Sequence, residues 1–191
     1  MLDGLYTDSI ADALDLADAH HWTRQPPRSD RARLRFLASR YPDIATLATH
    51  LHTTPAVLQD ILDRRRTAQG TPLHQAIVKE VIRLWQPQVR RRAHKKILNH
   101  EHQGMWVHFR AWFGFVGAAG SSDDGRMRHI SEHLPTAYAA RLFQARYRNG
   151  DEHELRTIVG DAVGEAYFKV SPTGGLHMVQ LTDIDYIEFS Y

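Results

Sequence analysis

Residues 105–115 read Met-Trp-Val-His-Phe-Arg-Ala-Trp-Phe-Gly-Phe, and this stretch decides the fold class. Apolar side chains stand at every second position, which is the period of a β-strand with one buried face. The residues expected on the buried face are Met105, Val107, Phe109, Ala111, Phe113 and Phe115. Because helical patterns precede this strand, the sequence predicts an α+β protein: a helical N-terminal half followed by a C-terminal half with a small sheet.

The chain beyond this strand contains further short elements. Residues 114–125 hold four of the twelve glycines and a polar run at 121–124, which predicts a loop. A second strand is expected over 126–134. Pro135 then opens a helix that Asn149 and Gly150 end. We expect another helix over 151–169 and a strand-rich segment over 178–191.

Helical patterns dominate the chain before Gly104. The sequence divides into an acidic N-terminal helix (1–23), a helix-turn-helix region (24–71), a long basic connecting helix (72–103) and an α+β domain (104–191). Pro87 should end or kink the connecting helix, because proline lacks an amide proton and clashes with the preceding turn. The role of the acidic helix stays open; one hypothesis is that it covers the chain's own basic segment.

Composition limits the function classes. The chain has 191 residues and no cysteine, which excludes disulfide scaffolds, thiol nucleophiles and cysteine zinc sites. The net charge is only +2, yet residues 24–96 carry 16 Lys/Arg against 5 Asp/Glu, and residues 151–191 carry 2 against 8. Such a basic middle favours a polyanionic partner such as nucleic acid. No apolar run spans a bilayer and the first 20 residues contain no Lys or Arg, so we expect a cytoplasmic protein and no membrane partner.

Residues 43–66 resemble a helix-turn-helix in spacing. Two short apolar stripes are separated by a turn at His52, and Thr54 with Pro55 can begin the second helix. The second helix offers Gln59 to a groove but no early arginine, so base-specific contacts are few. The residues expected near phosphates are Arg64, Arg65 and Arg66. The alternative is an ordinary helical hairpin.

A second basic run follows Pro87. Its cations are Arg90, Arg91, Arg92, Lys95 and Lys96. Trp85, Trp106 and Trp112 flank this run, and aromatic rings beside cations are typical of single-strand binding. Two alternatives weaken this interpretation: the cations form a solvated helix face, and Trp85 continues a core stripe.

The sequence predicts neither a metal site nor an enzyme in its own right. His129 and His133 have the spacing of a helical zinc pair, but they fall on an expected strand and no third ligand is evident. The chain also lacks a phosphate-cradling glycine-rich loop ending in Lys-Ser/Thr and a GxSxG nucleophile elbow.

Several short stretches form an ordered set from about Leu84 to the C-terminus, which is more than half of the chain. They are Trp85-Gln86-Pro87-Gln88, Gly120-Ser121-Ser122-Asp123-Asp124 with Arg126-Met127-Arg128-His129, Leu134-Pro135, Tyr138-Ala139-Ala140-Arg141-Leu142-Phe143, Glu165-Ala166-Tyr167-Phe168, and Thr182-Asp183-Ile184 with Ile187-Glu188-Phe189. Together, in this order, they resemble the telomere terminal proteins of linear Streptomyces chromosomes and plasmids.

The resemblance implies a protein primer. In that family a DNA polymerase joins the first deoxynucleotide to a side-chain hydroxyl, and the protein stays on the DNA 5′ end beside a single-stranded 3′ overhang. The implied partners are telomeric DNA, a telomere-associated protein and the polymerase. The implied acceptor is Ser122, although the family pattern has threonine there; Ser121 is the runner-up. The chain needs no cofactor of its own, since Mg²⁺ and dNTP are bound by the polymerase.

The role of the two acidic residues beside Ser122 stays open. Asp123 and Asp124 either imitate a primer phosphate or approach a metal, or they only cap the segment that follows.

The main alternative function of the chain is a non-covalent helix-turn-helix regulator whose C-terminal half dimerises. A polymerase or nucleotidyltransferase is less favoured, because it needs clustered carboxylates on strands and the sequence offers only this pair.

Overall fold

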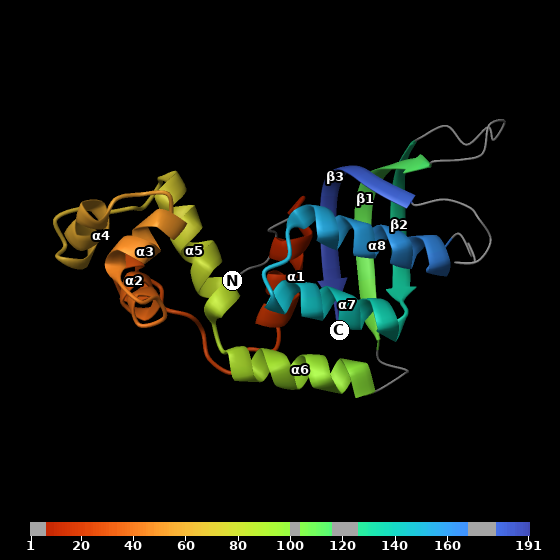
Figure 1. Cartoon of the computed structure of the whole chain (residues 1–191), viewed down its shortest axis with the longest axis horizontal. Helices are drawn as coiled ribbons and strands as arrows, with labels where there is room; N and C mark the ends of the chain where they lie inside the picture. The colour runs from red at the N-terminus through yellow and green to blue at the C-terminus, as the bar shows by residue number, and fades with distance from the viewer. Residues whose placement is uncertain (1–6, 100–103, 116–125, 168–178) are drawn as a thin grey trace. The chain divides into compact units, whose positions relative to one another are not determined.

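The computed structural model describes residues 7–99, 104–115, 126–167 and 179–191. These residues form eight helices and three strands, which confirms the α+β class (Figure 1). The chain divides into two compact units: unit 1 comprises residues 1–21 and 90–191, and unit 2 comprises residues 22–89. No helix of these described segments is long and apolar enough to cross a membrane.

Unit 1 contains an antiparallel sheet with the strand order β2-β1-β3. The strands are β1 (Met105–Phe115), β2 (Arg126–Leu134) and β3 (Val179–Ser190), each within a residue or so of its expected bounds. Phe109 in the middle of β1 pairs with Ile130 on one side and Ile187 on the other. All three side chains are buried, so the alternating pattern of β1 gives the sheet its apolar face.

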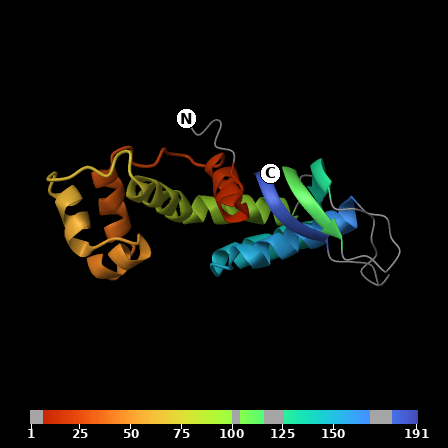
Figure 2. The same ribbon diagram turned by 90° about the horizontal axis from the view of Figure 1, so that it is seen from above.

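Helices α7 (Thr136–Tyr147) and α8 (Glu152–Ala166) cover that apolar face. Figure 1 draws both helices in front of the strands, and Figure 2 places α8 on one side of the sheet. Leu155, Val159 and Val163 recur at helical spacing on α8 and are fully buried. Asn149 ends the preceding helix with a φ of 57°, so it takes the left-handed position before Gly150.

Helix α1 (Ile10–Ala19) belongs to unit 1 and is not a separate N-terminal segment. Ser9 caps its first turn by accepting from the Asp12 amide. The Glu152 carboxylate, at the start of α8, accepts from the backbone amides of Ile10 at 2.6 Å and Ala11 at 3.3 Å. A negative charge at a helix N-terminus is favourable, so this contact fixes α1 against the C-terminal half of the chain.

The acidic face of α1 is buried against α6 (Pro87–Asn99). Asp18 is 1% exposed, and its carboxylate lies 2.6 Å from Arg90 Nε and 2.6 Å from His94 Nε2. The Tyr191 hydroxyl donates to the same carboxylate at 2.6 Å. Burial raises the pKa of Tyr191 well above its usual value, and the negative charge of Asp18 adds to this effect. The hypothesis that the acidic helix covers the basic segment therefore holds for one side of α6.

Unit 2 consists of four helices around a small apolar core. They are α2 (Asp30–Ala38), α3 (Ile44–His50), α4 (Pro55–Leu62) and α5 (Pro72–Leu84). Each begins at a side chain that accepts a hydrogen bond from the first turn: Ser29, Asp43, Thr54 and Thr71. His52, between α3 and α4, has a φ of 52°, so it takes the left-handed turn position where glycine is usual.

The expected connecting helix is instead two helices. Helix α5 ends at Leu84, Gln86 has a left-handed φ of 46°, and Pro87 is the first residue of α6. Proline suits a first helical position because its missing amide would be unpaired there. The boundary between the units falls inside α6, after Val89, so the expected domain boundaries at 23, 71 and 103 do not coincide with it.

The Glu80 carboxylate joins three elements of unit 2 and should make the stability of this unit pH-dependent. It accepts from Tyr41 at 2.5 Å and from Arg83 at 2.6 and 2.8 Å, and it lies 3.0 Å from His50. Burial by itself raises the pKa of Glu80, but the hydrogen bonds from Arg83 and Tyr41 outweigh it, so the pKa lies below its ordinary value of 4.5. Burial and Glu80 together raise the pKa of Tyr41 to about 12.

We expect Glu80→Gln to lower the free energy of unfolding of unit 2 by about 1.5–3 kcal/mol at pH 7, the worth of hydrogen bonds to a charged group. Since the folded-state pKa is depressed, the stabilisation is present above the unfolded-state pKa and is lost as the pH falls through the folded-state value. Urea unfolding of both proteins between pH 7 and pH 3 measures this. The difference between them should shrink toward pH 3; a constant difference would contradict the prediction.

Candidate nucleic-acid interface

A cavity of about 750 Å³ lies on unit 2 and is lined by side chains from α2 and from the segment that follows α4. Most of its charged groups are arginines. The arginines that line it are Arg28, Arg31, Arg35, Arg64, Arg65 and Arg66, and the other charged or titratable groups are Asp30 and His74. A cavity with this lining favours an anionic ligand.

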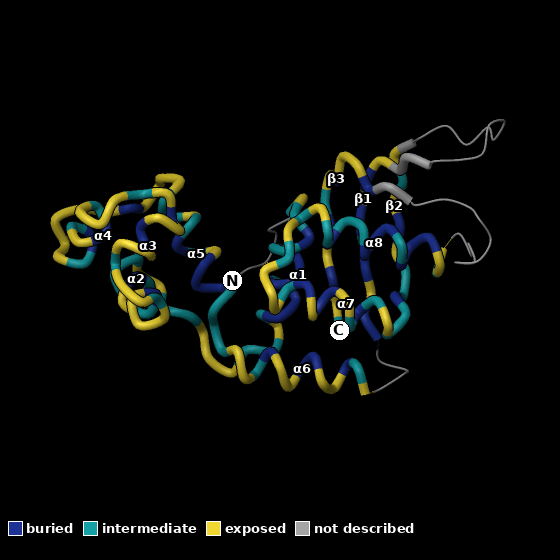
Figure 3. The backbone as a smooth tube through the Cα atoms, viewed as in Figure 1, coloured by how far each residue is buried: buried dark blue, intermediate teal, exposed yellow. Residues whose placement is uncertain are grey.

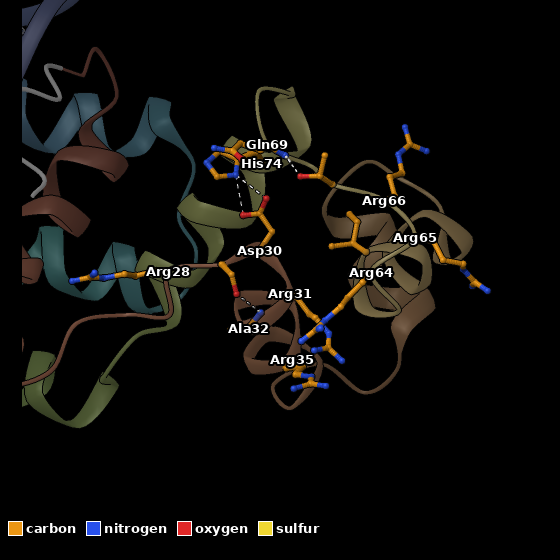
Figure 4. Close-up of a pocket in the computed structure, with 13 residues that line it drawn as sticks. Arg28, Asp30, Arg31, Ala32, Arg35, Arg64, Arg65, Arg66, Gln69 and His74 are labelled. Atoms are coloured by element: carbon orange, nitrogen blue, oxygen red, sulfur yellow. Dashed lines mark hydrogen bonds and ion pairs between the residues drawn. The ribbon is translucent and has the colours of Figure 1, made fainter.

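Three of these guanidinium groups form what we call the arginine cluster: Arg31, Arg35 and Arg64. Figure 4 shows them turned toward one another between α2 and the end of α4. Arg31 and Arg35 are four residues apart, so they share one face of α2. Arg31 Nε donates to the Leu62 carbonyl at 2.7 Å, which holds its guanidinium at the C-terminal end of α4. Arg64 follows that end with a φ of 64°.

The arginine cluster carries concentrated positive charge. Among the described residues no carboxylate pairs with Arg31, Arg35 or Arg64, whereas Asp30 is already paired with Arg33 at 3.0 Å and with His74 at 2.8 Å. The pKa of Arg31 is lowered, first by desolvation and then by the positive charges of Arg35 and Arg64. An anion bound here would relieve this repulsion, and phosphate oxygens match the planar donors of guanidinium.

The other residues that the sequence predicted as DNA contacts around α4 lie outside the arginine cluster. Arg65 pairs with Asp60 at 2.9 Å and Asp63 at 3.0 Å. Arg65 and Arg66 point away from the cluster in Figure 4. Gln59 is exposed on α4, and its amide donates to Asp63 at 3.1 Å. The cluster therefore lies at the C-terminal end of α4, away from its first turn.

Helix α6 separates its cations into two groups. Arg91, Arg92, Lys95 and Lys96 are exposed, and the buried residues between them pack into unit 1; Figure 3 shows the two classes alternating along the helix. Arg90 does not lie on the exposed face. It is 7% exposed and its guanidinium is paired with Asp18 at 2.6 Å and Asp15 at 3.4 Å. The expectation that Arg90 contacts DNA is therefore wrong, because its charge is buried and neutralised within unit 1.

The expected acceptor segment lies outside the described residues. Ser121, Ser122, Asp123 and Asp124 belong to residues 116–125, which connect β1 to β2. Phe113 pairs with Arg126, so the two strands are still paired where this connection begins and ends. No group of three or more His, Asp or Glu residues that could hold a metal is found among the residues that the structure describes.

No protein-family model, curated protein or solved structure matches this chain. Its function must therefore be inferred from the chain's own residues and from the resemblance of its short stretches.

Arg31 and Arg35 line the candidate interface, and the sequence patterns did not indicate them. A signal was present, because the spacing of four residues places both on one helix face and the stretch 31–35 holds three arginines. What the sequence could not supply was the approach of Arg64, which depends on how α2 packs against α4.

Proposed function

We propose that this chain is a nucleic-acid-binding protein primer of the terminal-protein kind. It binds telomeric DNA of a linear replicon, and a loop serine accepts the first deoxynucleotide. The observation that carries the nucleic-acid part is the arginine cluster: three guanidinium groups, from α2 and the segment after α4, that form no ion pair with a carboxylate of the described residues, although the charge of Asp63 acts on Arg31. The priming part rests on the resemblance of the ordered stretches, above all the one that contains Ser122.

In this proposal α3 and α4 act as a helix-turn-helix that contacts mainly the DNA backbone. The cations lie at the C-terminal end of α4, where they reach phosphates, and the first turn of α4 holds Ala56 and Val57 in place of arginine or lysine. Phosphate contacts fix the position of a protein on DNA but carry little sequence information. Sequence selection at the telomere is then the task of a partner, in keeping with a telomere-associated protein that binds the overhang.

Priming requires only an acceptor hydroxyl from this chain. The Ser122 oxygen attacks the α-phosphorus of a dNTP, a new phosphorus–oxygen bond forms, the bond to pyrophosphate breaks, and the hydroxyl proton passes to solvent or to a base of the polymerase. Serine is a weak nucleophile at its ordinary pKa. The polymerase supplies the activation through two metal ions about 3.5–4 Å apart. Asp123 and Asp124 follow Ser122 directly in the sequence, and in this proposal their carboxylates interact with those metals or imitate a primer phosphate.

The exposed face of α6 is a second backbone contact in this proposal. Arg91 and Arg92 together with Lys95 and Lys96 occupy one side of the helix over about two turns. Lysine binds phosphate as a point charge and arginine as a planar fork, so this face is suited to non-specific contact. It is also a candidate surface for the acidic side of a partner such as the polymerase.

Neutralising the arginine cluster should weaken DNA binding and reduce its salt dependence. We expect the triple variant Arg31→Gln/Arg35→Gln/Arg64→Gln to flatten the slope of log K against log salt by about 0.9 for each duplex phosphate that the variant no longer neutralises, because fewer counterions are released. Fluorescence anisotropy with a labelled telomeric duplex at several salt concentrations measures the slope.

The matched control is Arg40→Gln, which removes an exposed positive charge from unit 2 outside the cavity. It should change the slope by less than the value for one phosphate. A triple variant with the wild-type slope would show that the cluster does not contact DNA, and a chain that binds duplex tightly yet never accepts a nucleotide would favour the non-covalent regulator.

A further inference from the structure

The sheet of unit 1 has one face that no described helix of that unit covers. Helices α7 and α8 lie on the other face, and the side chains of β1 alternate accordingly. The outward residues of β1 are Trp106, His108, Arg110 and Trp112. Trp106 and Trp112 are 46% and 41% exposed, although tryptophan is costly to leave in water. Exposed aromatic patches of this kind mark interaction sites.

The neighbouring strand β2 extends this surface. Its outward residues lie directly beside those of β1: His133 beside Trp106, Ser131 beside His108, His129 beside Arg110 and Met127 beside Trp112. The Trp106 and His133 rings meet edge to face with their centroids 5.5 Å apart, and the Ser131 hydroxyl is hydrogen-bonded to His108 at 2.7 Å. Rings and planar groups thus lie along two adjacent strands.

On this face the carboxylates stand on β3 and not on β1 or the described part of β2. The outward positions of β1 and of the described part of β2 hold one guanidinium and three imidazoles and no carboxylate. The acidic groups Asp185 and Glu188 stand on β3, at the other side of β1, where Asp185 pairs with Arg110 at 3.0 Å. The carboxylates therefore disfavour an anionic chain over β3, whereas the described outward positions of β1 and β2 present ring nitrogens and a guanidinium without negative charge.

We propose that this face is a base-stacking platform for single-stranded nucleic acid. Trp106 and Trp112 are six residues apart on one strand, or about 20 Å at 3.3 Å per residue, which leaves room for several nucleotides between them. Every base has a ring face that stacks on an aromatic side chain, and Arg110 with the imidazoles can donate to phosphates. In duplex DNA the base faces are stacked on one another, so they are not available to stack on Trp106 and Trp112.

This inference deepens the proposed function, on which its biological meaning rests. The segment that contains Ser122 joins the ends of the same two strands, β1 and β2. A single strand bound on their outer face would therefore contact the same two strands that the acceptor segment connects. The ligand is then the unpaired 3′ end that serves as template for the first nucleotide.

The test measures binding of a fluorescein-labelled oligothymidylate of about 12 nucleotides, a length within the site sizes of such surfaces. The full chain carries Ser122→Ala and the Gln substitutions at Arg31, Arg35 and Arg64, so neither covalent transfer nor the arginine cluster contributes. We expect Trp106→Ala and Trp112→Ala each to raise Kd about 5- to 160-fold, the loss of one stacked base. Trp106→Phe and Trp112→Phe should recover most of the affinity, because they keep a ring.

The control is Tyr167→Ala, which removes an exposed aromatic ring of unit 1 at the C-terminal end of α8 and leaves the strands unchanged. It should leave Kd unchanged, and no tryptophan variant should alter the salt slope, because stacking releases no counterions. Circular dichroism verifies that each variant is folded, and quenching of tryptophan fluorescence in the chain with Trp106 and Trp112 intact gives a second readout.

Three outcomes would overturn the platform. The first is an unchanged Kd in both alanine variants, and the second is that a duplex binds with the same affinity and the same dependence on the two tryptophans. The third is that the alanine variants lose self-association, as measured by sedimentation, while their Kd for the oligonucleotide stays unchanged. The last outcome would make the face an interface between two copies of the chain. None of them would bear on priming, since covalent labelling of the chain with Ser122 intact is a separate measurement.

Discussion

Ser122→Ala is expected to abolish transfer of the first deoxynucleotide to the protein. The variant lacks the only oxygen that the proposal places at the α-phosphorus, and alanine offers no replacement. The measurement combines purified protein, a DNA polymerase or cell extract, a telomeric template, Mg²⁺ and a radiolabelled dNTP. Label that remains on the protein after nuclease treatment and denaturing electrophoresis reports the covalent bond.

Two neighbouring variants serve as controls for this loss. Ser121→Ala should keep most of the label, because it leaves the acceptor in place. Ser122→Thr should also keep it, since threonine supplies the same alcohol at that position. Peptide mapping by mass spectrometry then locates the nucleotide. Label on Ser121 or on a tyrosine would assign the acceptor elsewhere, and an unlabelled wild-type chain beside a labelled terminal protein would favour the regulator.

Asp18→Ala is expected to lower the free energy of unfolding of unit 1 by about 3–5 kcal/mol, the usual result of removing one member of a buried ion pair. The substitution removes from Arg90, at 7% exposure, its carboxylate at 2.6 Å, whereas the Asp15 carboxylate lies 3.4 Å away. It also takes the hydrogen-bond acceptor from Tyr191. Urea unfolding followed by circular dichroism and by tryptophan fluorescence measures the loss.

The matched control removes the same side chain from an exposed pair. Asp161 on α8 pairs with Arg141 at 3.1 Å, with the two side chains 33% and 47% exposed. Asp161→Ala should cost less than about 1 kcal/mol. In addition, the double variant Asp18→Ala/Arg90→Met should lose about 0.5–3 kcal/mol less than the sum of its two single variants, because no buried charge is left unpaired. Strict additivity would show that the two residues are not coupled.

Local signals in the sequence predicted most of the elements. The alternating pattern of β1, the Asn149-Gly150 stop and the His52 turn are each specified by residues that are close together in the sequence. These features depend on neighbours in the chain, so the sequence carries them. The break at Gln86 was predicted as an end or a kink at Pro87, because the proline rule does not say whether a helix stops or bends.

Long-range pairings could not be predicted in the same way. Arg90 looks like Arg91 and Arg92 in the sequence, and only the packing of α1 against α6 separates the buried guanidinium from the exposed ones. The arginine cluster likewise needs α2 beside the end of α4. Sequence charge counts locate a basic region, but which of its side chains face solvent depends on contacts between residues far apart in the chain.

The hydrogen bonds at the two ends of unit 2 have a consequence for how such a protein can change. The Thr23 amide donates to the Gln86 side chain at 3.0 Å, and the Trp85 indole donates to the Arg24 carbonyl at 2.9 Å, so the polypeptide enters and leaves this unit at neighbouring points. Unit 2 is thus an inserted cassette within a host domain that the polypeptide leaves after α1 and rejoins in α6. Exchange of the cassette between lineages would therefore replace the surface of unit 2 while the host domain keeps its fold.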